Sequence, residues 1–393
     1  MRAVLAAVID KATLDELGIG QLRDLYSELL FPGFSTIQTR SRYFLAVAKI
    51  LRDWADQTPA ARRRMPLAIY LHEQENKLTR HLVDSYEALG RKPKGVIGHT
   101  VVDKGGVQRR PSSTYWSGLQ KFGIVRRDQS LVEFCREWGA DGQFADRVSA
   151  DEGLDDEEHS PTDVLRPPDS KGDWRKGLTL DLTKDEAIFL AGCFKVGGQR
   201  GIAVTGQLLQ TKQVPAALRC EDFEAFAAWA RSNSRLDPRC AELVTKAWRF
   251  SLFVEGAHIV FNRLMAARLQ HAPLKQSTLR KWDEWREKSK KEHVFHLGAV
   301  AEWTSVLAFS DHPVSLKCED FLDQWNQAIS EGWSFARLEN LVERRALDTK
   351  DSRSLLRRTS GLSRNAKWFG MEALDFRWGT ARRMLRDIHE APK

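Results

Sequence analysis

The fold is decided by one stretch near the N-terminus, which reads Leu17-Gly-Ile-Gly-Gln-Leu-Arg-Asp-Leu-Tyr-Ser-Glu-Leu-Leu-Phe-Pro-Gly-Phe-Ser-Thr-Ile-Gln-Thr-Arg-Ser-Arg-Tyr-Phe-Leu45. Apolar residues recur at helical spacing over residues 22–31, and again over residues 43–54. Between them, Pro32-Gly33 must end the first helix, because proline cannot continue a helix and glycine accepts the turn that follows it. The stretch therefore predicts two amphipathic helices joined by a tight turn. Thr39, Arg40 and Arg42 at the start of the second helix form a candidate basic surface.

Helical spacing continues along most of the chain, so we expect a mainly α protein. Residues 1–150 predict an N-terminal helical domain, and residues 176–393 predict a C-terminal helical domain with a basic end. Between them, residues 151–169 hold eight acidic residues against one arginine, together with three prolines. Such a composition buries little apolar surface, so residues 151–175 predict an acidic, Pro-containing linker. Thr183 and Glu186 are spaced as a capping box, which predicts a helix start there.

Composition sets the broad class. The chain has 393 residues, 42% hydrophobic residues and a net charge of +8, which is typical of a soluble protein and permits an acidic partner such as DNA. Its five cysteines are widely spaced and form no Cys-x-x-Cys pair, which indicates reduced thiols and no zinc ribbon. We expect a cytoplasmic protein with no membrane contact, no cofactor and no metal.

The first candidate nucleic-acid site is the short helix predicted over residues 114–122. Hydroxyl residues stand at its start and arginine pairs flank it, an arrangement that attracts phosphate at a helix N-terminus. Its end resembles the recognition helix of winged-helix domains, so a winged-helix-like element is one interpretation. The other is an ordinary core helix anchored by Tyr115, Trp116 and Leu119. The candidate contacts are Arg109, Arg110, Ser112, Ser113, Lys121, Arg126 and Arg127.

A second candidate site is the basic C-terminal region. Residues 344–386 hold twelve Lys and Arg against four Asp and Glu, an excess that equals the net charge of the whole chain. Arginines interleaved with aromatic residues suit phosphate contacts and base stacking, although a solvated helix face gives the same pattern. The candidate residues are Arg357, Arg358, Arg364, Lys367, Arg377, Arg382, Arg383 and Arg386.

No catalytic motif is recognisable. The chain lacks a Gly-x-x-x-x-Gly-Lys-Ser/Thr loop and a Gly-x-Ser-x-Gly elbow. His72-Glu-Gln-Glu-Asn76 has asparagine where a zinc protease needs its second histidine, so a solvated helix is the better interpretation. Glu255, His258 and Asn262 share one helix face, and the absence of a second such motif favours a buried hydrogen-bond network over a di-iron site.

The opening stretch resembles an uncharacterised bacterial family that is defined only as a domain of unknown function. Further matching segments are Arg110-Pro-Ser-Ser-Thr-Tyr-Trp-Ser-Gly-Leu119, Glu255-Gly-Ala-His258, and Leu374-Asp-Phe-Arg-Trp378. Members of that family look to be encoded in mobile defence islands, near helicase, DNA-methyltransferase and phospholipase-D-like genes. The resemblance implies a role in defence against phage or other foreign DNA, and it supplies no catalytic residues.

These observations predict a non-catalytic subunit of a multi-gene antiphage defence system that docks on DNA without sequence specificity. The expected protein partners are a helicase, a methyltransferase or a phospholipase-D-like nuclease. One alternative is a protein–protein scaffold that uses its tryptophan-rich faces and does not bind DNA itself. A second alternative is an enzyme, such as a nuclease, whose site is not recognisable from the sequence.

Overall fold

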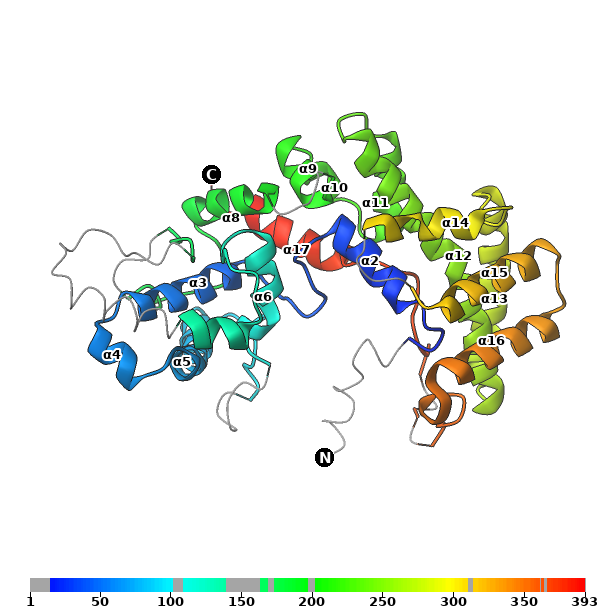
Figure 1. The fold of residues 1–393 in the computed structure, drawn as a ribbon, viewed down its shortest axis with the longest axis horizontal. Helices are drawn as coiled ribbons and strands as arrows, with labels where there is room; N and C mark the ends of the chain where they lie inside the picture. Colours follow the sequence, from blue (N-terminus) through cyan, green and yellow to red (C-terminus); the bar gives the residue numbers. More distant parts are fainter. Residues whose placement is uncertain are drawn as a thin grey trace. The chain divides into compact units, whose positions relative to one another are not determined.

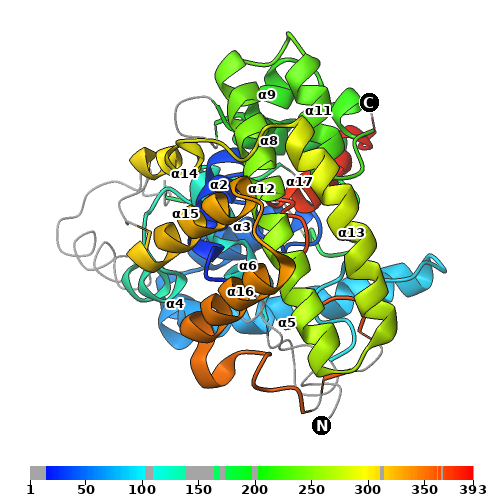
Figure 2. The same cartoon turned by 90° about the vertical axis from the view of Figure 1, so that its right-hand side faces the viewer.

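The computed structural model describes residues 15–101, 109–138, 163–168, 173–196, 202–309, 314–360, 362–363 and 366–392 (Figures 1 and 2). These residues are mainly helical, which confirms the predicted fold class. They contain no β-strand, and their one isolated β-bridge pairs Val125 with Val164 in antiparallel orientation.

The helices of the first half of the chain include the two predicted over residues 22–31 and 43–54, whereas the helix predicted from residue 114 begins three residues earlier, at Pro111. They are α2 (Gly20–Leu30), α3 (Arg42–Ala55), α4 (Pro59–Arg64), α5 (Leu67–Ala88), α6 (Pro111–Lys121) and α8 (Lys184–Val196). Residues 131–138 are also helical. The later elements are α9 (Val204–Gln210), α10 (Val214–Ala217), α11 (Phe223–Ser232), α12 (Pro238–Arg268), α13 (Ala272–Lys291), α14 (Ala299–Thr304), η3 (Ser305–Phe309), α15 (Leu316–Ser330), α16 (Phe335–Lys350), η4 (Asp351–Arg353) and α17 (Trp378–His389).

The chain forms two compact units, and each is built from several separate segments. The α3–α8 unit comprises Glu28–Asp222, Ser234–Cys240 and Arg377–Lys393, whereas the α12–α16 unit comprises Met1–Ser27, Phe223–Asn233 and Ala241–Phe376. This division differs from the linear scheme of two domains flanking residues 151–175. Helix α17, from the far end of the sequence, belongs to the same unit as α3.

The acidic segment is only partly described, because residues 151–162 and 169–172 lie outside the described residues. The described parts of it pack onto the α3–α8 unit. The carbonyl of Asp163 accepts the N–H of Arg126, and Arg166 pairs with Asp56 at 3.0 Å. Trp174 donates its indole N–H to Asp53 at 2.9 Å. Residues 163–168 and 173–175 are therefore an integral part of the α3–α8 unit.

An aromatic cluster forms the core of the α3–α8 unit. Helix α3 contacts α5 and α6, and its residues 43–51 are all buried. Phe44 and Phe122 lie 5.3 Å apart, and Phe122 and Phe194 lie 4.4 Å apart between ring centroids. Because aromatic side chains bury large areas, these contacts hold α3, α6 and α8 together in the arrangement that Figure 1 shows.

Helix α6 is a core helix and not an exposed recognition helix. A Cβ on Gly118 would lie 2.5 Å from the carbonyl oxygen of Gly33 and 2.6 Å from the ring of Phe44. The Phe31-Pro32-Gly33 turn thus packs directly against the middle of α6. Tyr115 and Leu119 are fully buried. The winged-helix interpretation is therefore not met in the described residues, which lack both an exposed recognition face and the strands of a wing.

Local sequence signals set two helix ends in this unit. Thr183 and Glu186 exchange the two hydrogen bonds of a capping box, at 3.0 and 3.3 Å, which confirms the predicted start of α8. Gly123, at φ +65°, ends α6 as predicted.

In the α12–α16 unit, α12 and α13 form a helical hairpin (Figure 2). Gly256 of α12 lies so close to Trp285 of α13 that a Cβ there would be 2.3 Å from the indole ring. Asn262, in the predicted polar stripe of α12, donates to the carbonyl of Phe369 and accepts the Phe369 N–H at 2.7 Å. Asn262 therefore joins a helix to a loop through buried hydrogen bonds, whereas Nε2 of His258 is buried without a hydrogen-bond partner among the described residues.

Candidate functional site

The basic residues at the start of α3 are held by carboxylates of the same unit. Arg40 pairs with Asp387 at 2.8 Å and with Asp181 at 2.9 Å. Arg42 pairs with the fully buried Glu186 at 2.7 Å. Thr39 is also engaged, because its hydroxyl donates to the carbonyl of Gly95. Since each guanidinium already has a carboxylate partner, Arg40 and Arg42 tie α3 to α17 and α8 and are poorly placed to bind phosphate.

The C-terminal basic residues are not gathered in one unit. Arg357, Arg358 and Lys367 belong to the α12–α16 unit, whereas residues 377–386 belong to the α3–α8 unit. Arg364 lies outside the described residues. Arg358 and Lys367 are exposed. The sequence run therefore does not correspond to a continuous surface of either unit.

Several of the same residues bond within their own unit. Arg382 donates twice to the carbonyl of Leu218, and Arg383 donates to the carbonyl of Gln38. The ion pairs formed by the remaining members are Arg377 with Glu28, Arg386 with Glu390 and Arg357 with Asp351. These contacts favour a structural role for α17, with its aromatic residues in the core.

The residues flanking α6 divide into two groups. Arg127 pairs with Asp163 at 2.8 Å and Lys121 lies 3.7 Å from Glu28, so both face carboxylates. Arg109 and Arg126 are exposed and form no ion pair within the described part of the chain. The others, Arg110, Ser112 and Ser113, line a pocket. The predicted C-terminal residue Lys367 lines a different cavity, in the α12–α16 unit.

This cavity, which we call the α5–α6 pocket, has a volume of about 670 Å³. It lies in the α3–α8 unit, and α4, α5, the start of α6 and residues 131–138 contribute its walls. Its lining residues are Trp54, Arg62, Pro66, Leu67, Ala68, Leu71, His72, Glu75, Arg110, Ser112, Ser113, Leu131, Val132, Cys135 and Arg136. Apolar walls with a few polar groups at one place are typical of small-molecule sites.

Glu75 is the chemically distinctive residue of the pocket. Its side chain is fully buried, and its Oε1 accepts the backbone N–H of Ser112 at 2.5 Å. Its Oε2 is buried and has no hydrogen-bond partner among the described residues. Burial raises the pKa of Glu75 to about 7, against the opposing effects of Ser112 and Arg110. At neutral pH this carboxyl can therefore either donate or accept a hydrogen bond.

Other polar groups in the pocket have limited reactivity or a different role. Burial raises the pKa of the Cys135 thiol to about 11, so it is protonated at neutral pH and is a poor nucleophile. Ser112 and Ser113 do not cap α6 with their side chains, contrary to the sequence prediction. The Ser113 hydroxyl instead donates to the carbonyl of Arg110. At the N-terminus of α6, Glu75 of α5 accepts the backbone N–H of Ser112 instead.

Three arginines from three elements lie at the pocket. Arg62 belongs to α4 and stacks over Trp54, 5.8 Å from the ring centroid. Arg110 precedes α6, and Arg136 lies in the helical residues 131–138. Two more exposed arginines, Arg63 and Arg64, complete α4. Arg62, Arg110 and Arg136, which are distant in sequence, thus line one pocket.

The sequence contained signals for two features of the pocket that were not predicted, the arginine run of α4 and the buried Glu75. The run Arg62-Arg-Arg64 was visible as a charge cluster, but nothing local placed it beside Arg110. Glu75 was interpreted as part of a solvated helix, which is wrong, because it is fully buried. It follows Leu71 by four residues and precedes Leu78 by three, so helical periodicity puts it on the apolar face of α5. A carboxylate at such a position is the signal that could have identified it.

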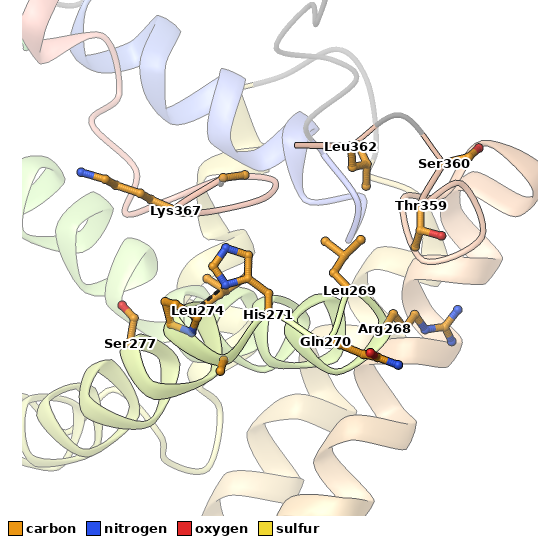
Figure 3. A pocket seen from close by; sticks show the side chains of 13 residues that line it. Arg268, Leu269, Gln270, His271, Leu274, Ser277, Thr359, Ser360, Leu362 and Lys367 are labelled. Carbon is orange, nitrogen blue, oxygen red and sulfur yellow. Dashed lines mark hydrogen bonds between the residues drawn. The ribbon is translucent and has the colours of Figure 1, made fainter. Parts of the chain in front are cut away.

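The α12–α16 unit has two larger cavities. One, of about 1080 Å³, lies between the α12–α13 turn and residues 359–367 (Figure 3). Its Arg268 is bonded to Glu343 and to the carbonyl of Leu356, and Nδ1 of His271 accepts the N–H of Leu274. The second, of about 680 Å³, is lined by aromatic residues that include Trp282, Trp285, Phe295, Trp333 and Phe335.

No group of three His, Cys, Asp or Glu side chains in the described part of the chain is placed to hold a metal ion. Among the helices of the described residues, none has the length and apolar character needed to cross a bilayer.

Comparison with known proteins places the α5–α6 pocket in a recognised segment. A family of unknown function (DUF6361) matches residues 3–142. All lining residues of the pocket, from Trp54 to Arg136, fall within that range. No curated protein and no solved structure matches the chain. The match thus covers less than half of the chain, and the family it points to has no defined activity.

Proposed function

We propose that this chain is a non-catalytic, DNA-docking subunit of a multi-gene bacterial antiphage defence system. The observation that carries the proposal is that Arg62, Arg110 and Arg136, from three elements, line the same α5–α6 pocket. Arginine is suited to this role because its planar guanidinium forms paired hydrogen bonds to phosphate oxygens.

Exposed arginines next to these residues in the sequence are further candidate contacts. Arg63 and Arg64 continue from Arg62 on α4, and Arg109 precedes Arg110 in the chain. Several phosphates of a DNA backbone could be contacted together by such a group, and phosphate contacts position a protein without reading sequence. This set keeps Arg109 and Arg110 from the sequence prediction. It omits Arg40, Arg42 and Arg382, which do not line the pocket and which bond to Asp387, Glu186 and the carbonyl of Leu218.

The defence role is supported by the resemblance to a family encoded near helicase, DNA-methyltransferase and phospholipase-D-like genes. A docking subunit in such a system would hold one of these enzymes on foreign DNA in the cytoplasm. No recognisable catalytic motif in the sequence argues for a reaction by this chain itself. The proposed partners are therefore DNA and at least one such enzyme.

The test is fluorescence anisotropy of a labelled duplex of about 30 bp during a salt titration, because phosphate-mediated binding weakens steeply with salt. The Arg62→Glu/Arg136→Glu variant should lose roughly tenfold or more in affinity and show a shallower salt dependence. Lys291→Glu, a charge reversal at an exposed position on α13, is the control and should change little. Equal affinity of both variants, or no binding at low salt, would contradict the proposal.

A protein–protein scaffold is the second candidate function. The aromatic-lined cavity of about 680 Å³ in the α12–α16 unit favours it, because tryptophan-rich pockets at a surface are typical of interface anchors. A complex with a purified helicase or nuclease partner that survives high salt, and that Trp333→Ala weakens, would support this function. If high salt abolishes both the complex with the partner and DNA binding, the result would instead support the DNA-docking role.

A further inference from the structure

We propose that the α5–α6 pocket binds one nucleotide unit, with the base beside Glu75 and its phosphate at Arg62, Arg110 and Arg136, which line the same pocket. This inference rests on the proposed function, since it names what the same surface recognises. It differs from simple backbone docking because it requires a base to leave the stack or to come from a strand end or a free nucleotide.

The buried end of the pocket is the first part of the argument. Glu75 Oε2 is buried without a hydrogen-bond partner among the described residues, although Oε1 is satisfied by Ser112. A buried polar atom left unbonded costs on the order of 1–3 kcal/mol, so a partner for it stabilises the protein. A hydrogen-bonding group of a ligand in the pocket would supply that partner.

The apolar walls of the pocket indicate what kind of ligand carries the hydrogen-bonding group. Leu67, Leu71 and Val132 give the pocket aliphatic surfaces, and a flat heterocycle with polar edges can pack its faces on them. The base edge then presents amino and ring nitrogen groups to Glu75. A cavity of about 670 Å³ is within the range that small-molecule sites commonly occupy.

The arginines that line the pocket supply the positive charge that a phosphate requires. Arg62, Arg110 and Arg136 line the same pocket as Glu75. An anion attached to the base by a sugar would therefore meet guanidinium groups while the base occupies the interior. Neither an isolated phosphate nor an uncharged apolar ligand would use both halves of this site.

The first arm of the experiment measures calorimetric binding of AMP, CMP, GMP and UMP to the full-length chain, with ribose 5-phosphate and inorganic phosphate as references. We expect at least one nucleotide to bind about tenfold or more tightly than ribose 5-phosphate, because the base contributes the pocket contacts. Ribose 5-phosphate binding as tightly as every nucleotide would overturn the inference.

A filled-pocket variant tests the location. Ala68 is exposed and lines the pocket, so Ala68→Trp should place an indole in it without disturbing the core. Ile69→Trp is the matched control, because Ile69 is the adjacent residue on α5, is 52% exposed and is not a lining residue. Ala68→Trp should weaken nucleotide binding about tenfold and Ile69→Trp less than about twofold. Equal effects would overturn the proposed location.

The second arm compares single-stranded and duplex DNA in the anisotropy assay. A preference for single strands that Ala68→Trp removes identifies a strand as the source of the base. Nucleotide binding without that preference identifies a free nucleotide. If duplex docking persists but no nucleotide or strand preference is found, this inference fails and the proposed function stands. If nucleotide binds but no duplex docking is found, this inference stands and the proposed function fails.

Discussion

Glu75 of α5 accepts the N–H of Ser112 in the first turn of α6, over 2.5 Å, so one helix caps the other. The carboxylate replaces the missing side-chain cap of α6 and meets the positive end of its helix dipole. Burial nevertheless dominates, because the fully enclosed side chain has its pKa raised to about 7. The contact is thus both a structural joint and a titrating group.

The stability of the protein should fall as pH rises through the pKa of Glu75. The folded protein holds this proton up to about pH 7, whereas the unfolded chain releases it near its ordinary value of 4.5. The folded state therefore binds more protons between these values, and the contribution, on the order of 3 kcal/mol, is fully present below pH 4.5 and lost above pH 7. Urea unfolding at pH 5 and pH 8 measures it.

Two variants of α5 separate this effect from other titrations. Glu75→Gln keeps the acceptor for Ser112 and cannot ionise, so its stability relative to wild type should increase from pH 5 to pH 8. Glu73→Gln, at an exposed neighbouring position, should follow the wild-type profile. If all three proteins share one pH profile, Glu75 does not titrate as described.

Local sequence patterns predicted those features whose partners are near in sequence. The capping box of Thr183 and Glu186 spans three residues and was correctly predicted. Arg40 could not be interpreted the same way, because its partner Asp387 lies 347 positions away and the ion pair forms only once α3 and α17 pack. The α5–α6 pocket depends on similar distant meetings. Charge runs alone therefore overestimated the exposed basic surface.

The Arg40–Asp387 ion pair should be needed for stability. Burial raises the pKa of Asp387, while Arg40 and the N–H of Ser41 oppose that shift, so removal of Arg40 leaves a mostly buried carboxylate without its cation. Arg40→Ala should lower the free energy of unfolding by about 2–4 kcal/mol. Arg386→Ala, which breaks an exposed 4.0 Å pair on the same helix as Asp387, should cost less than about 1 kcal/mol. Chemical denaturation that ranks the two variants equally would contradict the structural role of Arg40.

Gly118 should tolerate no side chain, because α6 packs against the Gly33 turn at that point. The Cβ of Gly118→Ala would lie 2.5 Å from a backbone oxygen, which cannot move as a flexible side chain would. We expect a loss of roughly 2–3 kcal/mol. Gly192→Ala on α8 is the matched control, since a Cβ there meets nothing within 4 Å, and it should stabilise by about 0.5–1 kcal/mol. A thermal melt in which both variants shift in the same direction would refute this packing.

Arg345 holds Leu17 and Gly18, the first two residues of the stretch quoted at the start, through hydrogen bonds to their carbonyls. Its guanidinium is buried, and it donates to the carbonyls of Leu17 at 2.7 Å, Gly18 at 3.3 Å and Lys317 at 2.8 Å. Lysine carries the same charge but cannot reach three acceptors with a planar fork. Arg345→Lys should therefore destabilise the α12–α16 unit by about 2–4 kcal/mol, since hydrogen bonds from a charged group are worth roughly 1.5–3 kcal/mol each.

Arg344→Lys, at the exposed neighbouring position on α16, should change the stability by less than about 0.5 kcal/mol. Urea unfolding followed by tryptophan fluorescence compares the two variants directly. If Arg345→Lys matched Arg344→Lys, charge alone would suffice at this position, and the three carbonyl contacts would not be what fixes the turn at Leu17 and Gly18.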